Sequence, residues 1–376
     1  MRLLLDVSAV PARPVGAGVY TVNLARGLAE RDGVDLHLLA RRDDAERWTA
    51  LAPSATVHPE VPTQRPARLL WEQLRAPSVA PRLGIDIWHG PHYTLPLRIG
   101  VPAVVTVLDM TFFDHPEWHE RVKVHFFRRM IPAALARADA AVAISDFTAR
   151  RLAQTLQPTI PVITAPLGVD TQRFRATPPD GEAGDLALLA HVGIRPPYLG
   201  FAATVEPRKN IPGLVAAFAA LASDHPDLRL VLAGRDGWGT RAVGEAVAAS
   251  GVATRILRPG WLPADVLSAM FRQAAAVVYP SLEEGFGLPA LEALACGAPL
   301  VTTTGSAMEE VVGDDAVLVP PGDDPALGEA IEKLLADPSR AEQLRTNGPA
   351  RAAGYTWSAA VDHHMDAYRT AMKAAA

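Results

Sequence analysis

The chain has 376 residues, of which 49% are apolar and 20% charged, and this composition and length favour a globular protein of two domains. Its net charge of −5 argues against general nucleic-acid binding, and its single cysteine, Cys296, excludes an internal disulfide and fits a reducing cytoplasm. No segment approaches the roughly 20 apolar residues of a spanning helix, and the N-terminus lacks a secretory-signal pattern, so we expect any membrane contact to be peripheral.

The first part of the chain alternates short apolar segments with longer amphipathic ones. The short segments indicate buried strands and the amphipathic ones indicate helices. Strands are expected at Leu3–Asp6, Leu36–Leu39, Ile85–His89, Ala103–Val107 and Ala140–Ile144, and helices at Val19–Glu30, Ala67–Arg75, Trp118–Arg137 and Phe147–Leu156. This alternation predicts a parallel sheet covered by helices on both faces.

A stretch rich in proline and glycine, residues 166–195, is expected to connect this part to a second one. Strands then follow at Tyr198–Ala203, Leu228–Leu232, Thr254–Leu257, Ala276–Val278, Leu300–Thr302 and Val317–Val319, and helices at Ile211–Leu221, Gly239–Ala249, Ala264–Arg272, Pro289–Ala295 and Pro325–Leu335. The sequence thus predicts two doubly wound α/β domains, residues 1–175 and 176–356. Because ligands bind at the carboxyl ends of the strands in such domains, we expect the site in a cleft between them.

Gly16-Ala17-Gly18 lies between the first expected strand and the first expected helix. Paired glycines let a phosphate approach the N-terminus of a helix, and they also occur in tight turns without a ligand. A dinucleotide site would need a third glycine at Thr21 and an acidic residue after the second strand, where the chain has Arg41 and Arg42. A nicotinamide cofactor is therefore not expected.

Glu206-Pro207-Arg208-Lys209-Asn210 follows the first strand of the second half, with Asn210 as a candidate N-cap of the next helix. Arg208 and Lys209 would lie at the carboxyl end of that strand, where two cations can neutralise a diphosphate. Negative charge develops on a leaving diphosphate in the transition state, so cations placed there lower the barrier. By itself, however, the segment is more typical of a solvated turn.

Glu284 and Glu292 are separated by the run Gly285-Phe286-Gly287-Leu288-Pro289-Ala290-Leu291. The glycines leave peptide N–H groups uncovered, and Pro289 suits the first turn of a helix, whose N-terminus favours an anion. The two carboxylates can accept hydrogen bonds from hydroxyl groups. The segment therefore suits a ligand with both phosphates and hydroxyls, such as a nucleotide sugar. The alternative is a buried strand–turn–helix with two solvated glutamates.

The glutamate spacing resembles the E-x7-E motif of the family-4 retaining glycosyltransferases, and Glu206–Asn210 closely resembles their E-P-R-K-N segment. The resemblance covers nearly the whole chain and is strongest in residues 198–320. It implies a GT-B fold, in which two Rossmann-like domains face each other across a cleft, the first binding the acceptor and the second the donor. It also implies that the last expected helix, Trp357–Met372, crosses back to the first domain as part of residues 357–376.

The resemblance also implies roles for individual residues. Arg208 and Lys209 would hold the diphosphate, Glu284 the sugar hydroxyls and Glu292 the ribose hydroxyls. Further donor-binding residues would be Gly16, Ala17, Gly18, Leu262, Gly285, Phe286, Gly287, Leu288 and Thr303. The basic pair makes a metal unnecessary, and no Asp-x-Asp motif lies at a strand end, so we expect neither a metal nor another cofactor.

Leu108-Asp109 departs from the family pattern, in which many members have His-Asp and the histidine contacts the transferred sugar. We expect Asp109, the retained member of the pair, among the catalytic residues. A leucine cannot donate a proton or a hydrogen bond, so a histidine has no obligatory role here unless His89, His92 or His115 replaces it. Leu108 is either an apolar wall for the sugar or a silent packing variant.

These features predict a retaining hexosyltransferase, with mannose as the first candidate, that uses a nucleoside-diphosphate sugar and a front-face mechanism. The acceptor would be a saccharide, a lipid-linked compound or a small molecule. A nucleotide-sugar epimerase, another GT-B enzyme such as a phosphorylase, and a catalytically silent nucleotide-sugar-binding partner remain alternatives. Trp118–Arg137 combines basic and aromatic residues, so a cytoplasmic protein in peripheral contact with the inner face of a membrane is also compatible with the sequence.

Overall fold

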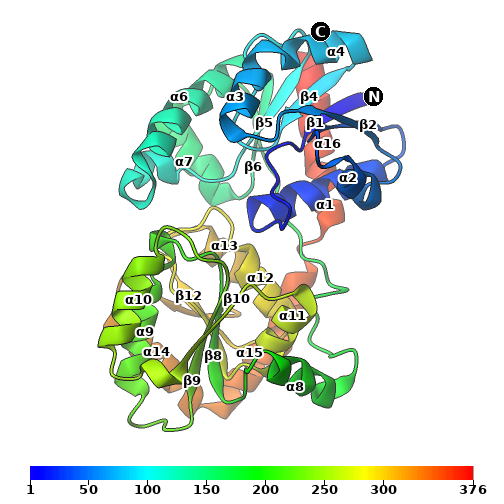
Figure 1. Ribbon diagram of the computed structural model, residues 1–376. Helices are drawn as coiled ribbons and strands as arrows, with labels where there is room; N and C mark the ends of the chain where they lie inside the picture. Colours follow the sequence, from blue (N-terminus) through cyan, green and yellow to red (C-terminus); the bar gives the residue numbers. More distant parts are fainter. Residues whose placement is uncertain (376) are drawn as a thin grey trace. The chain divides into compact units, whose positions relative to one another are not determined.

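The computed structural model describes residues 1–375, which form two compact units (Figure 1). Unit 1 comprises Met1–Gly168 together with the chain from Trp357 onward, and unit 2 comprises Val169–Thr356. Both are layered α/β structures in which buried apolar strands are covered by helices. None of the helices described in residues 1–375 has the length and apolar character needed to cross a bilayer.

Unit 1 is built on a seven-stranded parallel sheet of order β3-β2-β1-β4-β5-β6-β7. Its strands are β1 (Arg2–Asp6), β2 (Asp35–Arg41), β3 (Thr56–Val61), β4 (Ile87–Gly90), β5 (Ala103–Val107), β6 (Ala140–Ala143) and β7 (Val162–Thr164). Its helices are α1 (Ala17–Ala29), α2 (Ala45–Leu51), α3 (Arg65–Leu74), α4 (Val79–Leu83), α5 (Thr111–Asp114), α6 (Arg121–Arg137), α7 (Asp146–Leu156) and α16 (Trp357–Ala374). The strand order reverses between β1 and β4, which makes the carboxyl edge there the expected ligand position.

Unit 2 is built on a six-stranded parallel sheet of order β10-β9-β8-β11-β12-β13, and its order reverses between β8 and β11. Its strands are β8 (Tyr198–Ala202), β9 (Arg229–Ala233), β10 (Ile256–Gly260), β11 (Ala276–Tyr279), β12 (Leu300–Thr303) and β13 (Val317–Val319). Its helices are α8 (Gly181–His191), α9 (Ile211–Leu221), α10 (Thr240–Ala249), α11 (Ala264–Gln273), α12 (Leu288–Ala295), α13 (Ala307–Val312), α14 (Asp324–Ala336) and α15 (Pro338–Ala353).

The predicted fold class is confirmed, and each predicted strand and helix overlaps an observed one. The description of residues 166–195 as a mere connector was wrong, because α8 lies within it. Glycines near both ends of that helix hid its pattern in the sequence. The structure joins α8 to α11 through the buried Asp185, which accepts from Arg272 at 2.6 Å. The sequence also missed β3 and β7, one half-exposed and one only three residues long, and both lie at sheet edges.

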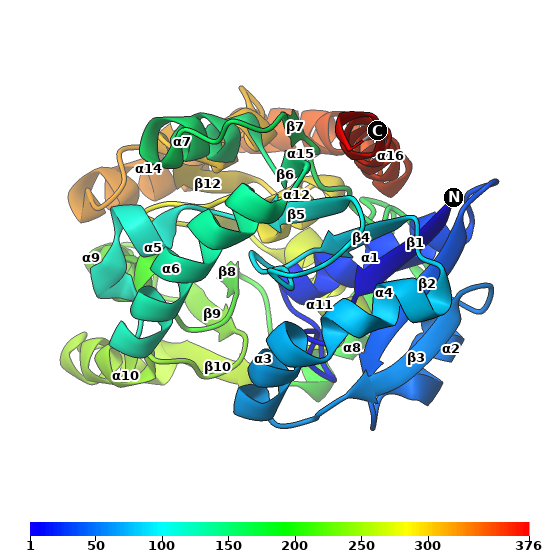
Figure 2. The same ribbon diagram turned by 90° about the horizontal axis from the view of Figure 1, so that it is seen from above.

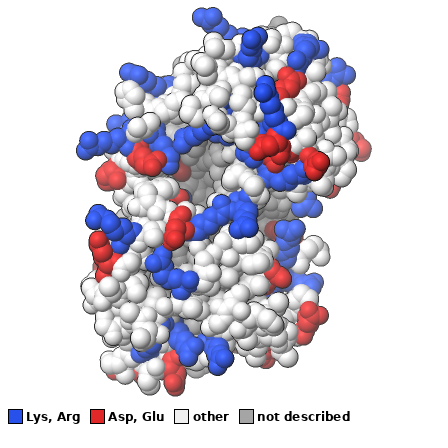
Figure 3. Space-filling model, in the orientation of Figure 1, with Lys and Arg blue, Asp and Glu red and all other residues white. Residues whose placement is uncertain are grey.

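Charged side chains are spread over both units. On the face shown in Figure 3, Lys and Arg side chains are interspersed with Asp and Glu side chains and form no single continuous basic surface. This distribution is consistent with the small net charge of −5. The face in this view therefore lacks the continuous basic surface that is typical of nucleic-acid binding.

The C-terminal helix α16 belongs to unit 1, where it packs against α1 and the strands β5, β6 and β7 (Figure 2). A series of buried side chains holds it there through four hydrogen bonds of 2.8 Å. In order, the bonded residues are Tyr368, His89, Thr106, Tyr20 and His364. The helix is therefore an integral layer of unit 1.

The direction of each hydrogen bond in this series can be deduced. His364 Nδ1 lies 2.6 Å from the carbonyl of Ala360, which can only accept, so Nδ1 carries the proton and Nε2 accepts from the Tyr20 hydroxyl. Tyr20 then accepts from the Thr106 hydroxyl, which in turn accepts from His89 Nε2. The series ends with the Tyr368 hydroxyl, which donates to His89 Nδ1. Both imidazoles must be neutral, and burial lowers the pKa of His364 to about 4 and that of His89 well below its ordinary value.

We predict that the free energy of unfolding falls as the pH drops from about 6.5 toward 4. The unfolded chain binds protons at these two histidines over that window and the folded chain does not, so acid favours unfolding. His364→Leu should flatten the pH dependence and leave the Tyr20 hydroxyl without an acceptor, at a cost of about 1–3 kcal/mol at pH 7. Urea unfolding monitored between pH 4 and 8 measures both effects.

The matched control is His363→Leu, because His363 is the exposed neighbour on the same helix. It should leave the pH dependence unchanged. Equal effects of the two substitutions would contradict the deduced hydrogen-bond chain.

Candidate active site

Two loops meet at the carboxyl edge of the unit 2 sheet, where its strand order reverses. The loop after β8 carries Arg208 and Lys209 in a short 3-10 turn, and the loop after β11 carries Glu284. A main-chain hydrogen bond of 2.7 Å from Leu282 N to Arg208 O joins them. The topological switch point of unit 2 therefore brings together the residues that the sequence placed on separate segments.

The carboxylate of Glu284 bridges the two cations. One oxygen accepts from Arg208 Nη1 and the other from Lys209 Nζ. Arg208 Nε is also held by Glu206 at 2.9 Å. Lys209 and Glu284 are each only 6% exposed, so these charges lie largely out of water.

The pKa values in this cluster follow from burial and mutual charge. Burial alone would raise the pKa of Glu284, but the neighbouring Arg208 and Lys209 outweigh it and lower that pKa to about 2. Burial, and then the charge of Arg208, lower the pKa of Lys209. Glu284 is therefore firmly ionised, and it holds two cations, Arg208 and Lys209, together at this edge of the sheet, where an anion can interact with both.

The N-terminus of α12 lies directly after Glu284. Gly287 has a φ of 95°, and a Cβ there would come within 2.8 Å of Met308, so both conformation and packing require glycine. Among residues 1–375, none accepts a hydrogen bond from the peptide N–H groups of Phe286, Gly287 and Leu288. These uncovered donors at a helix start form an anion-binding arrangement beside the cation pair.

Glu292 lies about one turn into α12 and is only partly exposed. Its carboxyl receives no hydrogen bond or ion pair from any residue in the described part of the chain. Burial, reinforced by the negative charge of Asp170, raises its pKa to about 8. A polar group held in this unfavourable state is typical of a binding residue whose partner is a ligand.

Three other predicted positions are less open. Leu262 and Thr303 are buried, and the Thr303 hydroxyl donates to Ser281 O at 2.5 Å, so it joins β12 to the loop after β11. Asn210 occupies the N-cap position of α9, but its side chain donates to Asp324 and does not cap the helix, which corrects that prediction. Roles of Leu262 and Thr303 in donor binding stay predictions.

In unit 1, the glycine loop begins α1. Gly16 is the N-cap residue with a φ of 46°, and Gly18 packs closely enough that a Cβ would lie 3.0 Å from Pro14. Ala17 is the first helical residue. The structure thus gives local reasons for both glycines, and phosphate binding by the loop stays a prediction.

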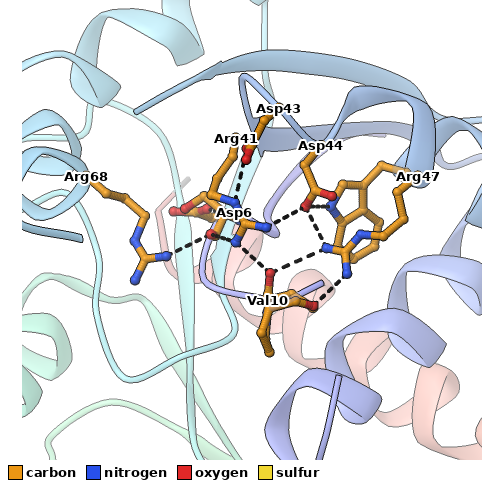
Figure 4. A network of polar contacts seen from close by, with 10 residues as sticks. Asp6, Val10, Arg41, Asp43, Asp44, Arg47 and Arg68 are labelled. Atoms are coloured by element: carbon orange, nitrogen blue, oxygen red, sulfur yellow. Dashed lines mark hydrogen bonds and ion pairs between the residues drawn. The ribbon is translucent and has the colours of Figure 1, made fainter. Parts of the chain in front are cut away.

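The loop between β1 and α1 is held by arginines (Figure 4). Arg41 donates to Val10 O at 2.7 Å and Arg47 donates to Pro11 O at 2.6 Å. Asp44 accepts from both arginines, at 3.1 and 2.5 Å. From the sequence, Arg41 only argued against a dinucleotide site, and these contacts of Arg41 and Arg47 with the loop were not predicted.

Comparison with known proteins decides the family. The model of "Glycosyltransferase Family 4" matches residues 14–173, and that of "Glycosyl transferases group 1" matches residues 192–351. O-antigen chain mannosyltransferase B of Escherichia coli is 30% identical, over 75% of this chain and 74% of that protein. A D-inositol 3-phosphate glycosyltransferase of Stackebrandtia nassauensis is 31% identical, over 95% of this chain and 87% of that protein.

The chain belongs to the family-4 glycosyltransferases. Solved structures agree on its GT-B fold. Sucrose-phosphate synthase from Thermosynechococcus elongatus superposes with a TM-score of 0.80 at 21% identity over all of both chains. HepE of Anabaena, solved with UDP-glucose, superposes with a TM-score of 0.76 at 18% identity, over 98% of this chain and 99% of that one.

In this glycosyltransferase, Asp109 follows β5 and accepts hydrogen bonds from the backbone N and hydroxyl of Thr111, at 3.2 and 2.8 Å. Because that hydroxyl donates to Asp109, His119 Nε2, 2.9 Å away, must donate to it. His119 was not among the histidines considered from the sequence. A turn at Pro116–Trp118 brings it back, and no spacing rule indicates that return.

The histidines proposed as substitutes at Leu108 have other roles. His89 was a wrong candidate, because both its ring nitrogens are used in the buried chain that fastens α16. His115 pairs with Glu117 and stacks on Trp118 at 3.8 Å between ring centroids. Leu108 itself is buried, at 7% exposure.

We predict that Glu284→Gln destabilises unit 2 by about 3–5 kcal/mol, because two buried cations lose their counter-charge. Inorganic pyrophosphate should then raise the melting temperature of the variant more than that of the wild type, since it replaces the missing negative charge. Thermal unfolding with and without pyrophosphate measures this. Glu329→Gln, at an exposed i,i+4 pair with Lys333, is the control and should behave as wild type.

We predict that Glu292→Gln stabilises the protein at high pH. The folded-state pKa of about 8 exceeds the ordinary 4.5, so the wild type loses stability as the pH rises through this interval, and glutamine removes that loss. The gain at pH 9 should be on the order of a few kcal/mol, because each pKa unit corresponds to about 1.4 kcal/mol. Urea unfolding of both proteins at pH 5 and pH 9 checks it, and an equal difference at both values contradicts it.

Proposed function

We propose that the enzyme is a retaining glycosyltransferase that transfers a hexose from a nucleoside-diphosphate sugar, held by unit 2, to an acceptor held by unit 1. The observation that carries this proposal is the buried Arg208–Glu284–Lys209 bridge beside uncovered N–H groups of α12. Two adjacent cations and free backbone donors suit a diphosphate, and the carboxyl of Glu292 suits ribose hydroxyls.

The chemistry assigned to the cations is stabilisation of the leaving group. As the bond between the sugar carbon and the diphosphate oxygen breaks, negative charge grows on the diphosphate. Arg208 and Lys209 favour that state over the ground state, which lowers the barrier. We propose that this charge neutralisation makes a metal unnecessary.

The carboxylates of the site do not suit a covalent intermediate. Both oxygens of Glu284 are bound to cations and its pKa is about 2, which makes it a weak nucleophile. Asp109 accepts two hydrogen bonds from Thr111. We therefore propose front-face attack, in which the acceptor oxygen bonds to the sugar carbon and its proton passes to the departing phosphate oxygen.

Mannose is proposed as the sugar because of the similarity to an O-antigen mannosyltransferase. HepE, which shares the fold, is solved with UDP-glucose, so the base remains a matter for experiment. A lipid-linked acceptor is compatible with α3, which exposes Leu70 and Leu74 at 61% and 67%. Peripheral contact with a membrane is part of this proposal.

The test is transfer by the purified chain, with GDP-mannose and UDP-glucose as donors and a panel of mannosides as acceptors. We expect acceptor-dependent release of the nucleoside diphosphate, a product that keeps the anomeric configuration of the donor by NMR, and no loss of rate with EDTA. Lys209→Ala should lower kcat by about 100-fold or more. Lys333→Ala, which removes an exposed lysine of the same unit, should not.

Other outcomes point to the alternatives. Isomerisation of the donor without an acceptor indicates an epimerase. Donor binding, seen as a thermal shift, without any turnover indicates a silent binding partner. An inverted product contradicts the proposed mechanism even if transfer occurs.

A further inference from the structure

A second polar cluster lies at the carboxyl edge of the unit 1 sheet, where the strand order reverses between β1 and β4. Its side chains come from the end of β1, from α3 and from the loop after β4, and are Asp6, Arg68, Glu72, His92 and Thr94. The donor chemistry proposed above uses none of them. His92 Nε2 and part of the Arg68 guanidinium have no partner among residues 1–375, and such unpaired groups call for a ligand.

Burial acts on both carboxyl groups of the cluster. Asp6 accepts from Ser8, whose N donates at 2.9 Å, and burial raises the pKa of the Asp6 carboxyl. Glu72 is 8% exposed and accepts two long bonds of 3.2 Å, from the Thr94 hydroxyl and the Gln73 amide. Burial, and then the charge of Asp6, raise the pKa of Glu72 to about 8, so near neutral pH it mostly carries a proton that it can donate.

Arg68 lies beside both carboxyl groups. Its Nη1 donates to Ser8 O at 2.9 Å, and the remaining guanidinium N–H groups find no acceptor among the described residues. Figure 4 shows it approaching from the side opposite Arg47, whose guanidinium is turned toward Asp44 and the backbone. Arg68 therefore has donors to spare.

His92 adds an unpartnered atom. Its Nε2 is buried and has no hydrogen-bond partner in the described chain, while burial and then the charge of Arg68 lower its pKa to about 4 and keep the ring neutral. The loop that presents it is constrained. A Cβ on Gly90 would lie 2.2 Å from the Thr94 carbonyl, and Tyr93 has a left-handed φ of 64°. Such strain is found where a structure holds a functional side chain in place.

The charges of the cluster identify the class of ligand. Two carboxyl groups, Asp6 and Glu72, lie beside Arg68, and burial raises the pKa of both carboxyls, so this cluster is not built around cations as the unit 2 site is. Its neighbour Arg41 is engaged by Asp44 and by the Val10 carbonyl. Spare donors and acceptors in such a setting match the hydroxyl groups of a sugar, each of which donates and accepts.

We propose that Asp6, Arg68, Glu72 and His92 bind the hydroxyl groups of an uncharged saccharide acceptor. This rests on the proposed function and narrows it, because it excludes a phosphorylated cyclitol of the kind named for the D-inositol 3-phosphate glycosyltransferases. On α3, Arg68 and Glu72 would face the acceptor while Leu70 and Leu74 stay exposed. The acceptor is then recognised by its hydroxyl pattern.

The test compares several acceptors and measures the KM for the donor and the KM for the acceptor separately. Transfer is measured to methyl α-mannoside, to mannobiose and to inositol 3-phosphate. We expect transfer to a neutral mannoside and not to inositol 3-phosphate. Asp6→Asn and Arg68→Met should each raise the KM for the neutral acceptor at least about tenfold, equivalent to roughly 1.4 kcal/mol, with the donor KM within about twofold of wild type.

Two further variants distinguish binding from folding. Glu72→Gln keeps the size of the side chain and one acceptor oxygen, and should raise the acceptor KM less than Glu72→Ala does. Asp43→Asn, an exposed carboxylate of the same edge, is the matched control and should change neither KM. In every variant, a thermal shift on adding the nucleotide sugar checks that unit 2 is folded and still binds the donor.

The outcomes keep the two proposals apart. If no nucleotide sugar binds or turns over, the proposed function fails. The present inference fails if the donor binds but only inositol 3-phosphate, or no neutral mannoside, accepts the sugar. It also fails if Asp6→Asn and Arg68→Met raise the donor and acceptor KM equally, or raise neither.

Discussion

The interaction on which the account depends is the bridging of Arg208 and Lys209 by the carboxylate of Glu284. It ties the loop after β8 to the loop after β11 at the point where the unit 2 sheet reverses its strand order. A buried ion group of this kind contributes little net stability, because desolvation offsets its mutual attraction. We attribute its position at the ligand edge of the sheet to the two cations that it holds there for a substrate.

The two units carry complementary chemistry on equivalent edges of similar sheets. Unit 2 presents two adjacent cations and uncovered backbone donors, which suit phosphates. Unit 1 presents a group of polar side chains around Arg68 with spare donors and acceptors, which suits hydroxyls. Both groups lie where the strand order of a parallel sheet reverses, so one rule of α/β architecture accounts for the position of the proposed donor site and of the proposed acceptor site.

Sequence reasoning predicted the local structure of the candidate site where its residues lie within one short segment. The Arg208-Lys209 pair and the Glu284–Glu292 spacing are local patterns whose geometry follows from a strand, a turn and a helix start. It failed where partners come from distant segments, as with the neutral His89 that is fixed by Tyr368 of the last helix. No spacing along the chain reveals such pairings, because packing decides them.

The most direct test of the central claim is a crystal structure of the protein with a bound nucleoside diphosphate. The account predicts diphosphate oxygens within hydrogen-bond distance of the Arg208 guanidinium, the Lys209 ammonium and the N–H groups at the start of α12. A nucleotide bound elsewhere, with Glu284 still the only partner of Lys209 and no phosphate near either cation, would contradict it.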